Sequence, residues 1–319
     1  MKTCWKELVL AVVLAWGMPW IVMAAAEVAF GDKPAQPVMQ TQPPQTEAVS
    51  APRQIILVWS EGVLRQMELT DYLTGVLISE MPGSFHGEAK KAQAIVARTY
   101  TLRRLNGSDK HPGAVCTDSR CCQGYLDPDT FDDPETVRLA RSAVEATENL
   151  VLTYGDELID ATYFSCSGGM TEDAVAVWGS DVPYLQSVES PGEEIAAHYT
   201  DTVSFTKEQI EAALGISLKG SPGNWIGTAV YTEGDGVASI VIGGKSFRGT
   251  QIRSALGLRS TAFEAKAGDG RITFTTKGYG HRVGMSQYGA QAMALSGNDY
   301  RQILAHYYTG TLVKQWNDK

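Results

Sequence analysis

The sequence has little basic charge and lacks the common nucleotide-binding motifs. Its 319 residues include 27 lysines and arginines against 36 aspartates and glutamates, which gives a net charge of -9. Because contacts to phosphate need a dense surplus of positive charge, this balance argues against nucleic acid as a partner. The sequence also has no phosphate loop, dinucleotide fingerprint or internal repeat. It therefore gives no support to a nucleotide-dependent or repeat protein.

The composition that remains is that of a globular protein. Apolar residues make up 44% of the chain and charged residues 20%. A chain of this length can bury a core without metal or disulfide support, and its composition excludes a disordered or fibrous protein.

The amino-terminal segment has the pattern of an export signal. Lys2 and Lys6 precede a run from Leu8 to Ala26 that carries no charge. The run ends in small residues that offer a cleavage site, and it is also long enough for an uncleaved, tilted span. Both alternatives stay open. We expect residues 1–26 to act as a single membrane anchor with an extracytoplasmic globular domain, or as a signal that is cleaved before secretion.

The rest of the chain divides by composition. Residues 27–54 are rich in proline and glutamine and predict a semi-rigid tether. Residues 55–315 predict an α+β domain, in which a mixed helical and β core forms a groove. Short β-like runs at 227–232 and 238–243 predict a smaller, β-rich inserted subdomain at about 199–274.

Glu80 stands at the predicted end of a helix. The run Glu68–Glu80 has apolar residues at helical spacing, and Met81 precedes a proline, which disfavours further helix. Unpaired carbonyls at a helix end disfavour an ionised carboxyl, and apolar neighbours such as Ile78 desolvate it. We therefore expect a raised pKa for Glu80, suited to holding and donating a proton.

A second predicted helix, at about 88–105, is basic. Its positive side chains are those of Lys90, Lys91, Arg98, Arg103 and Arg104. They form either a solvated helix face or a local patch for an anionic substrate. Arg98 is flanked by apolar residues and is the candidate for substrate binding.

The loop after this helix carries the residue types of a zinc site. One histidine and three cysteines lie within a dozen positions, His111, Cys116, Cys121 and Cys122. Their spacing is not that of a standard zinc finger. Disulfides are the alternative, because an exported chain meets oxidising conditions and Cys166 gives it a fourth cysteine.

Three blocks of sequence resemble the sporulation protein D (SpoIID) family, which includes the LytB-type amidase enhancers. The first block comprises Tyr72–Pro82 and Glu88–Tyr100, and the second comprises Tyr163–Thr171, Val177–Gly179 and Pro183–Leu185. The third comprises Gly278–Ala290 and Ile303–Gly310. The similarity spans Ile55 to Val313, in order. One departure is Arg282, where the family usually has a glycine; this arginine either narrows the site or points to solvent.

The resemblance implies a peptidoglycan lytic transglycosylase with Glu80 as its catalytic acid/base. Such an enzyme cleaves glycan strands stripped of stem peptides and leaves 1,6-anhydro-muramoyl ends. Glu88 and Glu172 are the competing acids. The alternatives are a non-catalytic, peptidoglycan-binding enhancer of an N-acetylmuramoyl-L-alanine amidase and a zinc hydrolase that uses the Cys/His loop.

The resemblance also implies ligands, substrate contacts and partners. His111, Cys116 and Cys122 are the expected ligands of a structural zinc ion, with Cys121 as the alternate and Cys166 as a distant fourth. The predicted substrate-binding residues in the second and third blocks are Ser165, Ser167, His281, Ser286, Gln287 and Tyr288; structural turns are the alternative for each. The implied partners are an amidase and a membrane protein of the engulfment machinery.

Overall fold

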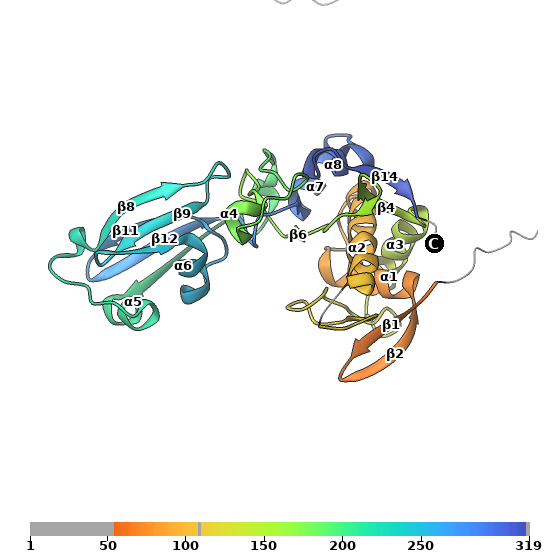
Figure 1. Cartoon of the computed structure of the whole chain (residues 1–319), viewed down its shortest axis with the longest axis horizontal. Coiled ribbons are helices and arrows are strands. Elements are labelled where there is room, and N and C mark those ends of the chain that lie inside the picture. Colours follow the sequence, from red (N-terminus) through yellow and green to blue (C-terminus); the bar gives the residue numbers. More distant parts are fainter. Residues whose placement is uncertain (1–53, 108–109, 317–319) are drawn as a thin grey trace, which may run out of the picture. The chain divides into compact units, whose positions relative to one another are not determined.

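The computed structural model describes residues 54–107 and 110–316 (Figure 1). The predicted anchor at 1–26 and the tether up to residue 53 lie outside these ranges. In the described part of the chain, no helix combines the length and apolar content that a membrane span needs.

The described residues form eight helices and fourteen strands, which bears out the predicted α+β class. The helices are α1 (Leu69–Glu80), α2 (Gly87–Gly107), α3 (Pro134–Ala146), α4 (Ala174–Trp178), α5 (Lys207–Leu214), α6 (Gly249–Leu256), α7 (Gln287–Leu295) and α8 (Tyr300–Tyr307). The strands up to the middle of the chain are β1 (Ile55–Ser60), β2 (Val63–Glu68), β3 (Val115–Cys116), β4 (Leu150–Tyr154), β5 (Glu157–Leu158), β6 (Tyr163–Phe164) and β7 (Thr200–Thr206). The later strands are β8 (Ile226–Tyr231), β9 (Val237–Ile242), β10 (Lys245–Arg248), β11 (Ala262–Gly268), β12 (Arg271–Lys277), β13 (Met285–Ser286) and β14 (Leu312–Gln315).

Helix α1 places Glu80 at its carboxyl end, as the sequence predicts. Leu73, Val76 and Leu77 are buried on its packed face. At Met81 the backbone becomes extended, with φ -126° and ψ 135°. This is the conformation that a following proline favours, so Glu80 is the last helical residue.

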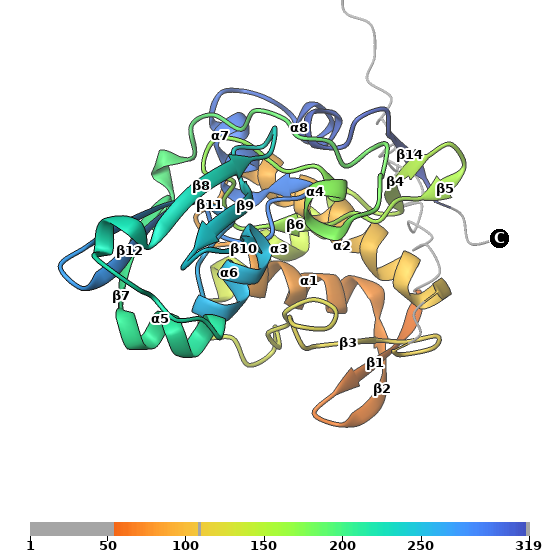
Figure 2. The same ribbon diagram turned by 60° about the vertical axis from the view of Figure 1, so that its left-hand side comes forward.

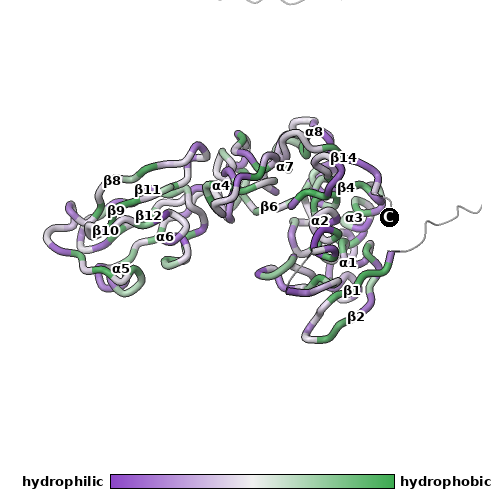
Figure 3. Tube along the Cα trace, viewed as in Figure 1, coloured by the Kyte–Doolittle hydropathy of each residue, from purple (hydrophilic) through white to green (hydrophobic). Residues whose placement is uncertain are grey.

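A three-stranded sheet, in the order β2-β1-β3, lies at the start of the described chain. Figure 3 shows β1 as a largely apolar strand. Its Ile56 and Val58 are buried with residues of α1 and α2, whereas Ile55, Leu57 and Trp59 face outward. This alternation is that of a strand with one covered face.

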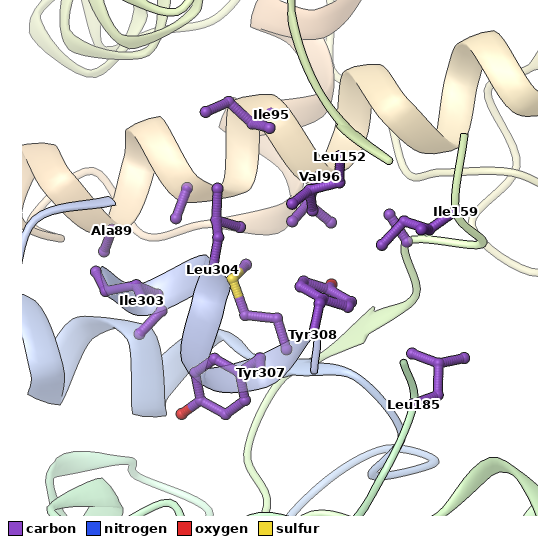
Figure 4. Close-up of a cluster of buried hydrophobic side chains, with 14 of the residues drawn as sticks. Ala89, Ile95, Val96, Leu152, Ile159, Leu185, Ile303, Leu304, Tyr307 and Tyr308 are labelled. Atoms are coloured by element: carbon purple, nitrogen blue, oxygen red, sulfur yellow. The ribbon is translucent and has the colours of Figure 1, made fainter. Parts of the chain in front are cut away.

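A second core cluster joins α2 to the carboxyl-terminal helices. Ile303 and Leu304 of α8 are buried with Ala89, Ile95 and Val96 of α2, and Figure 4 shows these side chains together. The packing brings the first and third sequence blocks into contact, although about 200 residues of chain separate them.

A third cluster is built from residues between Val203 and Phe274. It lies among the antiparallel sheets β10-β9-β8 and β11-β12-β7 and the helices α5 and α6. Helix α6 packs on β9 and β10 (Figure 2). The predicted subdomain boundaries at 199 and 274 enclose this cluster, and its status as a separate domain stays a prediction.

Candidate active site

A cavity of about 500 Å³ gathers residues from all three sequence blocks. One predicted catalytic residue and three predicted substrate-binding residues line it: Glu80, Ser165, His281 and Gln287. Its other lining residues are Tyr100, Arg104, Ser119, Arg120, Cys121, Cys122, Thr162, Tyr163, Phe164, Tyr279 and Gly280. Its volume is in the usual range for small-ligand sites, roughly 300–1,000 Å³.

The carboxyl group of Glu80 is partly buried in this cavity. The backbone N–H of Gly124 donates to its Oε1 atom over 2.9 Å. Burial raises the pKa of Glu80, and hydrogen bonds from Gly124, Tyr163 and Gln287 oppose that rise. The predicted direction is thus confirmed, with burial as the largest cause. The carboxyl group therefore keeps its proton to higher pH. When it ionises, hydrogen-bond donors from Gly124, Tyr163 and Gln287 can stabilise the carboxylate.

One of these donors, Tyr163, belongs to a short hydrogen-bonded chain. The Tyr163 hydroxyl donates to Oε1 of Gln123 over 3.2 Å, and Nε2 of Gln123 donates to Oγ1 of Thr101 over 2.9 Å. Burial raises the pKa of Tyr163 well above its ordinary value, so its hydroxyl stays protonated. Tyr163 and Gln123 were not among the predicted site residues. Two signals were available in the sequence: Tyr163 is the first residue of the second block, and Gln123 directly follows Cys122.

Gly124 is the residue that allows the backbone to approach Glu80. A Cβ atom at this position would lie 2.6 Å from Oγ of Ser79 and 3.1 Å from Oε1 of Glu80. Only glycine therefore permits this contact without displacing a neighbour.

Four side chains in the preceding loop form a compact cluster. The potential ligand atoms of His111, Cys116, Cys121 and Cys122 all lie within 4.8 Å of one another. Nε2 of His111 is 3.5 Å from Sγ of Cys121. Tetrahedral zinc with Zn–S bonds of about 2.3 Å separates its ligand atoms by roughly 3.8 Å, so the donor set fits this ion. The three expected ligands are brought together with Cys121, the alternate.

The fourth described cysteine is elsewhere. Cys166 is buried, and its thiol donates to Oε2 of Glu193 over 3.0 Å. All four cysteines in the described ranges are free thiols, and none is paired in a disulfide. Cys166 is not part of the His/Cys cluster, and its thiol is hydrogen-bonded to Glu193 instead. The prediction that Cys166 is a distant metal ligand is therefore wrong.

His281 forms a neutral part of the cavity wall. Burial and, second, the nearby positive charge of Arg253 lower its pKa to about 4. Its Nδ1 atom accepts a hydrogen bond from the N–H of Val283 over 3.1 Å. The imidazole ring centre lies 5.5 Å from the ring centres of Phe164 and Trp178. This group is suited to contact a sugar and is a poor acid at neutral pH.

Arg98 does not belong to the cavity, and the predicted substrate-binding role is not supported. The residue is 4% exposed, and its guanidinium donates to the carbonyls of Val144, Thr147 and Leu150. These carbonyls lie at and just after the end of α3, where they lack helical partners. Lys90 is likewise buried against backbone carbonyls. Of the five basic residues on α2, only Arg104 lines the cavity.

Three more predicted substrate contacts have structural roles. The hydroxyl of Ser167 donates to buried Glu193, which also accepts from the N–H of Gly168. Ser286 caps α7 by accepting from the N–H of Gly289 over 3.2 Å. The ring of Tyr288 packs on Phe85. None of the three predicted contacts lines the cavity.

Arg282 is buried, so the alternative that it points to solvent is wrong. Its backbone has φ 68°, in the left-handed region that favours glycine, which accounts for the glycine usual at this position in the resembled family. Its guanidinium pairs with Glu172 over 3.3 Å and donates to the carbonyls of Ser167, Met170 and Gly234. It therefore ties the second block to the β8–β9 turn.

The two competing acids are engaged outside the cavity. Glu172 is 1% exposed in its pair with Arg282 and accepts a hydrogen bond from Thr232. Glu88 pairs with Lys91 over 2.7 Å and accepts from the N–H of Tyr300. Glu80 is the one carboxyl group among the described residues that line the cavity. The geometry thus defines a single-carboxyl site next to a His/Cys cluster.

Comparison with known proteins places this chain in a family. Residues 60–154 match the family model described as "Stage II sporulation protein". The chain is 38% identical to "Stage II sporulation protein D" of Bacillus amyloliquefaciens over 293 residues, which cover 89% of this chain and 82% of the relative. The chain belongs to the stage II sporulation protein D family.

Two proteins of Bacillus subtilis strain 168 are also similar. One, "Stage II sporulation protein D", is 40% identical over 262 residues, or 79% of this chain and 76% of the relative. The other, "Amidase enhancer", is 30% identical over 300 residues, or 76% of this chain and 40% of the relative.

Proposed function

We propose that this protein is a peptidoglycan lytic transglycosylase that acts on glycan strands stripped of stem peptides, in sporulation and engulfment. The observation that carries the proposal is Glu80, a partly buried carboxyl group with a raised pKa that stands alone in the lining of the cavity. A glycosidase that adds water uses two carboxyl groups across the scissile bond. A transglycosylase that closes an anhydro ring needs only one.

The surroundings of Glu80 suit both halves of that reaction. Protonated Glu80 donates its proton to the glycosidic oxygen as the bond to the muramoyl residue breaks. The N–H of Gly124 then stabilises the carboxylate, and the hydroxyl of Tyr163 does so as well when it turns from Gln123 to Glu80. That carboxylate takes the proton of the sugar's own 6-hydroxyl, whose oxygen attacks the anomeric carbon and forms the 1,6-anhydro ring. The acid is thereby regenerated without water entering the product.

The His/Cys cluster would hold zinc beside this site. His111, Cys116, Cys121 and Cys122 supply four protein ligands, which is the composition of closed, structural zinc sites. Bound zinc would supply rigidity to the loop whose Gly124 contacts Glu80. A full set of protein ligands leaves no position for a reactive water, so this arrangement does not favour the zinc hydrolase.

The second candidate function is a non-catalytic enhancer of an N-acetylmuramoyl-L-alanine amidase. The observation that favours it is the similarity to the B. subtilis amidase enhancer. Under both functions, residues 1–26 anchor the protein at the cell membrane or are cleaved on export. Residues 27–54 tether a body that meets peptidoglycan outside the cell, together with an amidase and a membrane protein of the engulfment machinery.

The test is mass analysis of products released from denuded peptidoglycan. We expect anhydro-terminated sugars from the native protein, none from Glu80→Gln, and a normal amount from the control Glu264→Gln, an exposed residue of β11. Retained turnover by folded Glu80→Gln would refute the assignment. Reducing ends lost on chelation would indicate the zinc hydrolase. Absent products, with amidase stimulation that survives Glu80→Gln, would indicate the enhancer.

A further inference from the structure

Two arginines lie against the part of the cavity wall that the third sequence block forms, and neither is among the residues that line the cavity. The guanidinium of Arg259 lies over the ring of Tyr279, 5.1 Å from its centre, and pairs with Asp201 over 2.8 Å. The carbonyl oxygen of Arg259 accepts a hydrogen bond from the N–H of Gly280 over 3.0 Å. This contact fixes the cavity wall to the loop that follows α6.

Arg253 reaches the same point from α6. Its Nε atom donates to the carbonyl oxygen of Arg259 over 3.3 Å. The Arg253 guanidinium therefore lies close to the backbone of Gly280. Gly280 and its two neighbours in the chain, Tyr279 and His281, line the cavity. The positive charge of Arg253 is close enough to contribute to the lowered pKa of His281.

Arg253 differs from Arg259 in its lack of an acidic partner. Within the ranges 54–107 and 110–316, no ion pair includes Arg253, and burial lowers the pKa of its guanidinium. The side chain is half-buried, so part of its hydration is lost. A desolvated guanidinium without a carboxylate is costly, and that cost is recovered when an anion binds.

Two exposed aromatic side chains lie close to His281, the residue whose pKa the charge of Arg253 helps to lower. Trp178 is 46% exposed and Tyr279 is 44% exposed, and the ring of Trp178 lies 5.5 Å from that of His281. Exposed aromatic side chains that lie close together are a common feature of surfaces that meet a ligand. Apolar ring faces next to a cation match a sugar that carries a carboxylate.

We propose that Arg253 recognises the lactyl carboxylate of a muramoyl residue that rests against Trp178 and Tyr279. This inference depends on the proposed function, because it takes peptidoglycan glycan as the ligand. The carboxylate is free in a stripped strand, whereas in a substituted strand it is an amide bonded to the stem peptide. A guanidinium makes charge-assisted, paired hydrogen bonds only to the free acid. Arg253 thereby gives a physical reason for a preference for denuded glycan.

The experiment measures binding, so that the substrate stays intact. The full chain carrying Glu80→Gln is titrated with denuded glycan oligosaccharides and with the same oligosaccharides after chemical amidation of their lactyl carboxylates. We expect the free acids to bind about tenfold more tightly, a difference of about 1.4 kcal/mol. Arg253→Gln should abolish that preference and leave the affinity for amidated chains unchanged. Arg253→Lys should restore it in part, and Arg271→Gln, an exposed arginine of β12, should have no effect.

The outcomes separate this inference from the proposed function. A normal preference for free acids in folded Arg253→Gln, or equal binding of the two ligands by the parent, would overturn the role of Arg253. Equal loss of affinity for both ligands would also overturn it, because a merely structural defect has that effect. If the native chain releases no anhydro sugars but still prefers free acids through Arg253, the proposed lytic activity is refuted and the proposed carboxylate site is supported.

Discussion

Replacing Gly124 by alanine tests whether the backbone of the cysteine loop holds Glu80, the proposed catalytic acid, in place. The added Cβ atom would lie 2.6 Å from Oγ of Ser79 and 3.1 Å from Oε1 of Glu80. The exposed Ser79 hydroxyl relieves the first contact by rotating. The second requires the carboxyl group of Glu80 to move by a few tenths of an ångström, which weakens its 2.9 Å hydrogen bond to the N–H of residue 124.

We expect activity and stability to respond differently to this change. Displacement of a catalytic group by about 1 Å costs on the order of 100-fold in rate, so this smaller shift should lower kcat by roughly 10- to 100-fold. The backbone φ of Gly124 is not in the left-handed region, so alanine introduces no backbone strain. Thermal unfolding should therefore change by only a few degrees, since alanine also restricts the unfolded chain.

The assay is release of anhydro-terminated sugars from denuded glycan, together with thermal unfolding of each variant. Gly268→Ala is the matched control, because a Cβ atom there meets nothing within 4 Å. If Gly124→Ala turns over within twofold of the native rate, the Gly124 N–H does not position Glu80 and the reasoning is refuted.

Three further predictions concern the acid, the buried ion pair and the metal cluster. Because folding raises the pKa of Glu80, its contribution to stability is greatest at low pH and is lost as pH rises through the folded pKa. Glu80→Gln should therefore melt a few degrees above the native protein at pH 7 and at the same temperature as the native protein near pH 3. The activity of the native protein should fall as pH rises through the folded pKa of Glu80. Arg282→Gly should lower the free energy of unfolding in denaturant by about 3–5 kcal/mol, since it leaves Glu172 buried and unpaired; relief of the left-handed backbone offsets only about 1 kcal/mol. Protein purified without added metal should contain one zinc ion by mass spectrometry, and Cys116→Ser should lose it and melt lower, whereas Cys166→Ser should keep it.

The sequence could predict features that depend on a few neighbouring residues. Helix α1 ends at Glu80 because Met81 precedes a proline, and both are adjacent in the chain. The His/Cys cluster was predictable for the same reason, since its four residues stand in one short loop. The order of the sequence blocks, together with the family they resemble, indicated that Glu80, Ser165, His281 and Gln287 share a site.

Features that depend on distant backbone could not be predicted in this way. Arg98 is a basic residue on a helix, and only the fold shows that three carbonyls of another segment surround it. Glu193 has no motif of its own, yet it holds the serine and glycine residues of the second block. Tyr163 reaches Gln123 and Glu80 across the cavity. Each role depends on burial and on contacts between residues far apart in sequence.

The loop that joins the cysteine cluster to the acid makes the site sensitive to oxidation. Cys122 is separated by one residue from Gly124, whose N–H contacts Glu80, and its thiol lies within 4.8 Å of two others. Thiols this close are within reach of disulfide formation once no metal holds them, although burial raises the pKa of Cys122 to about 12 and slows attack by its thiolate. We therefore expect an oxidant to inactivate the metal-free protein, and a reductant followed by zinc to restore it. The proposed catalytic role of Glu80 would then be under redox control, although a carboxyl group is itself inert to these reagents.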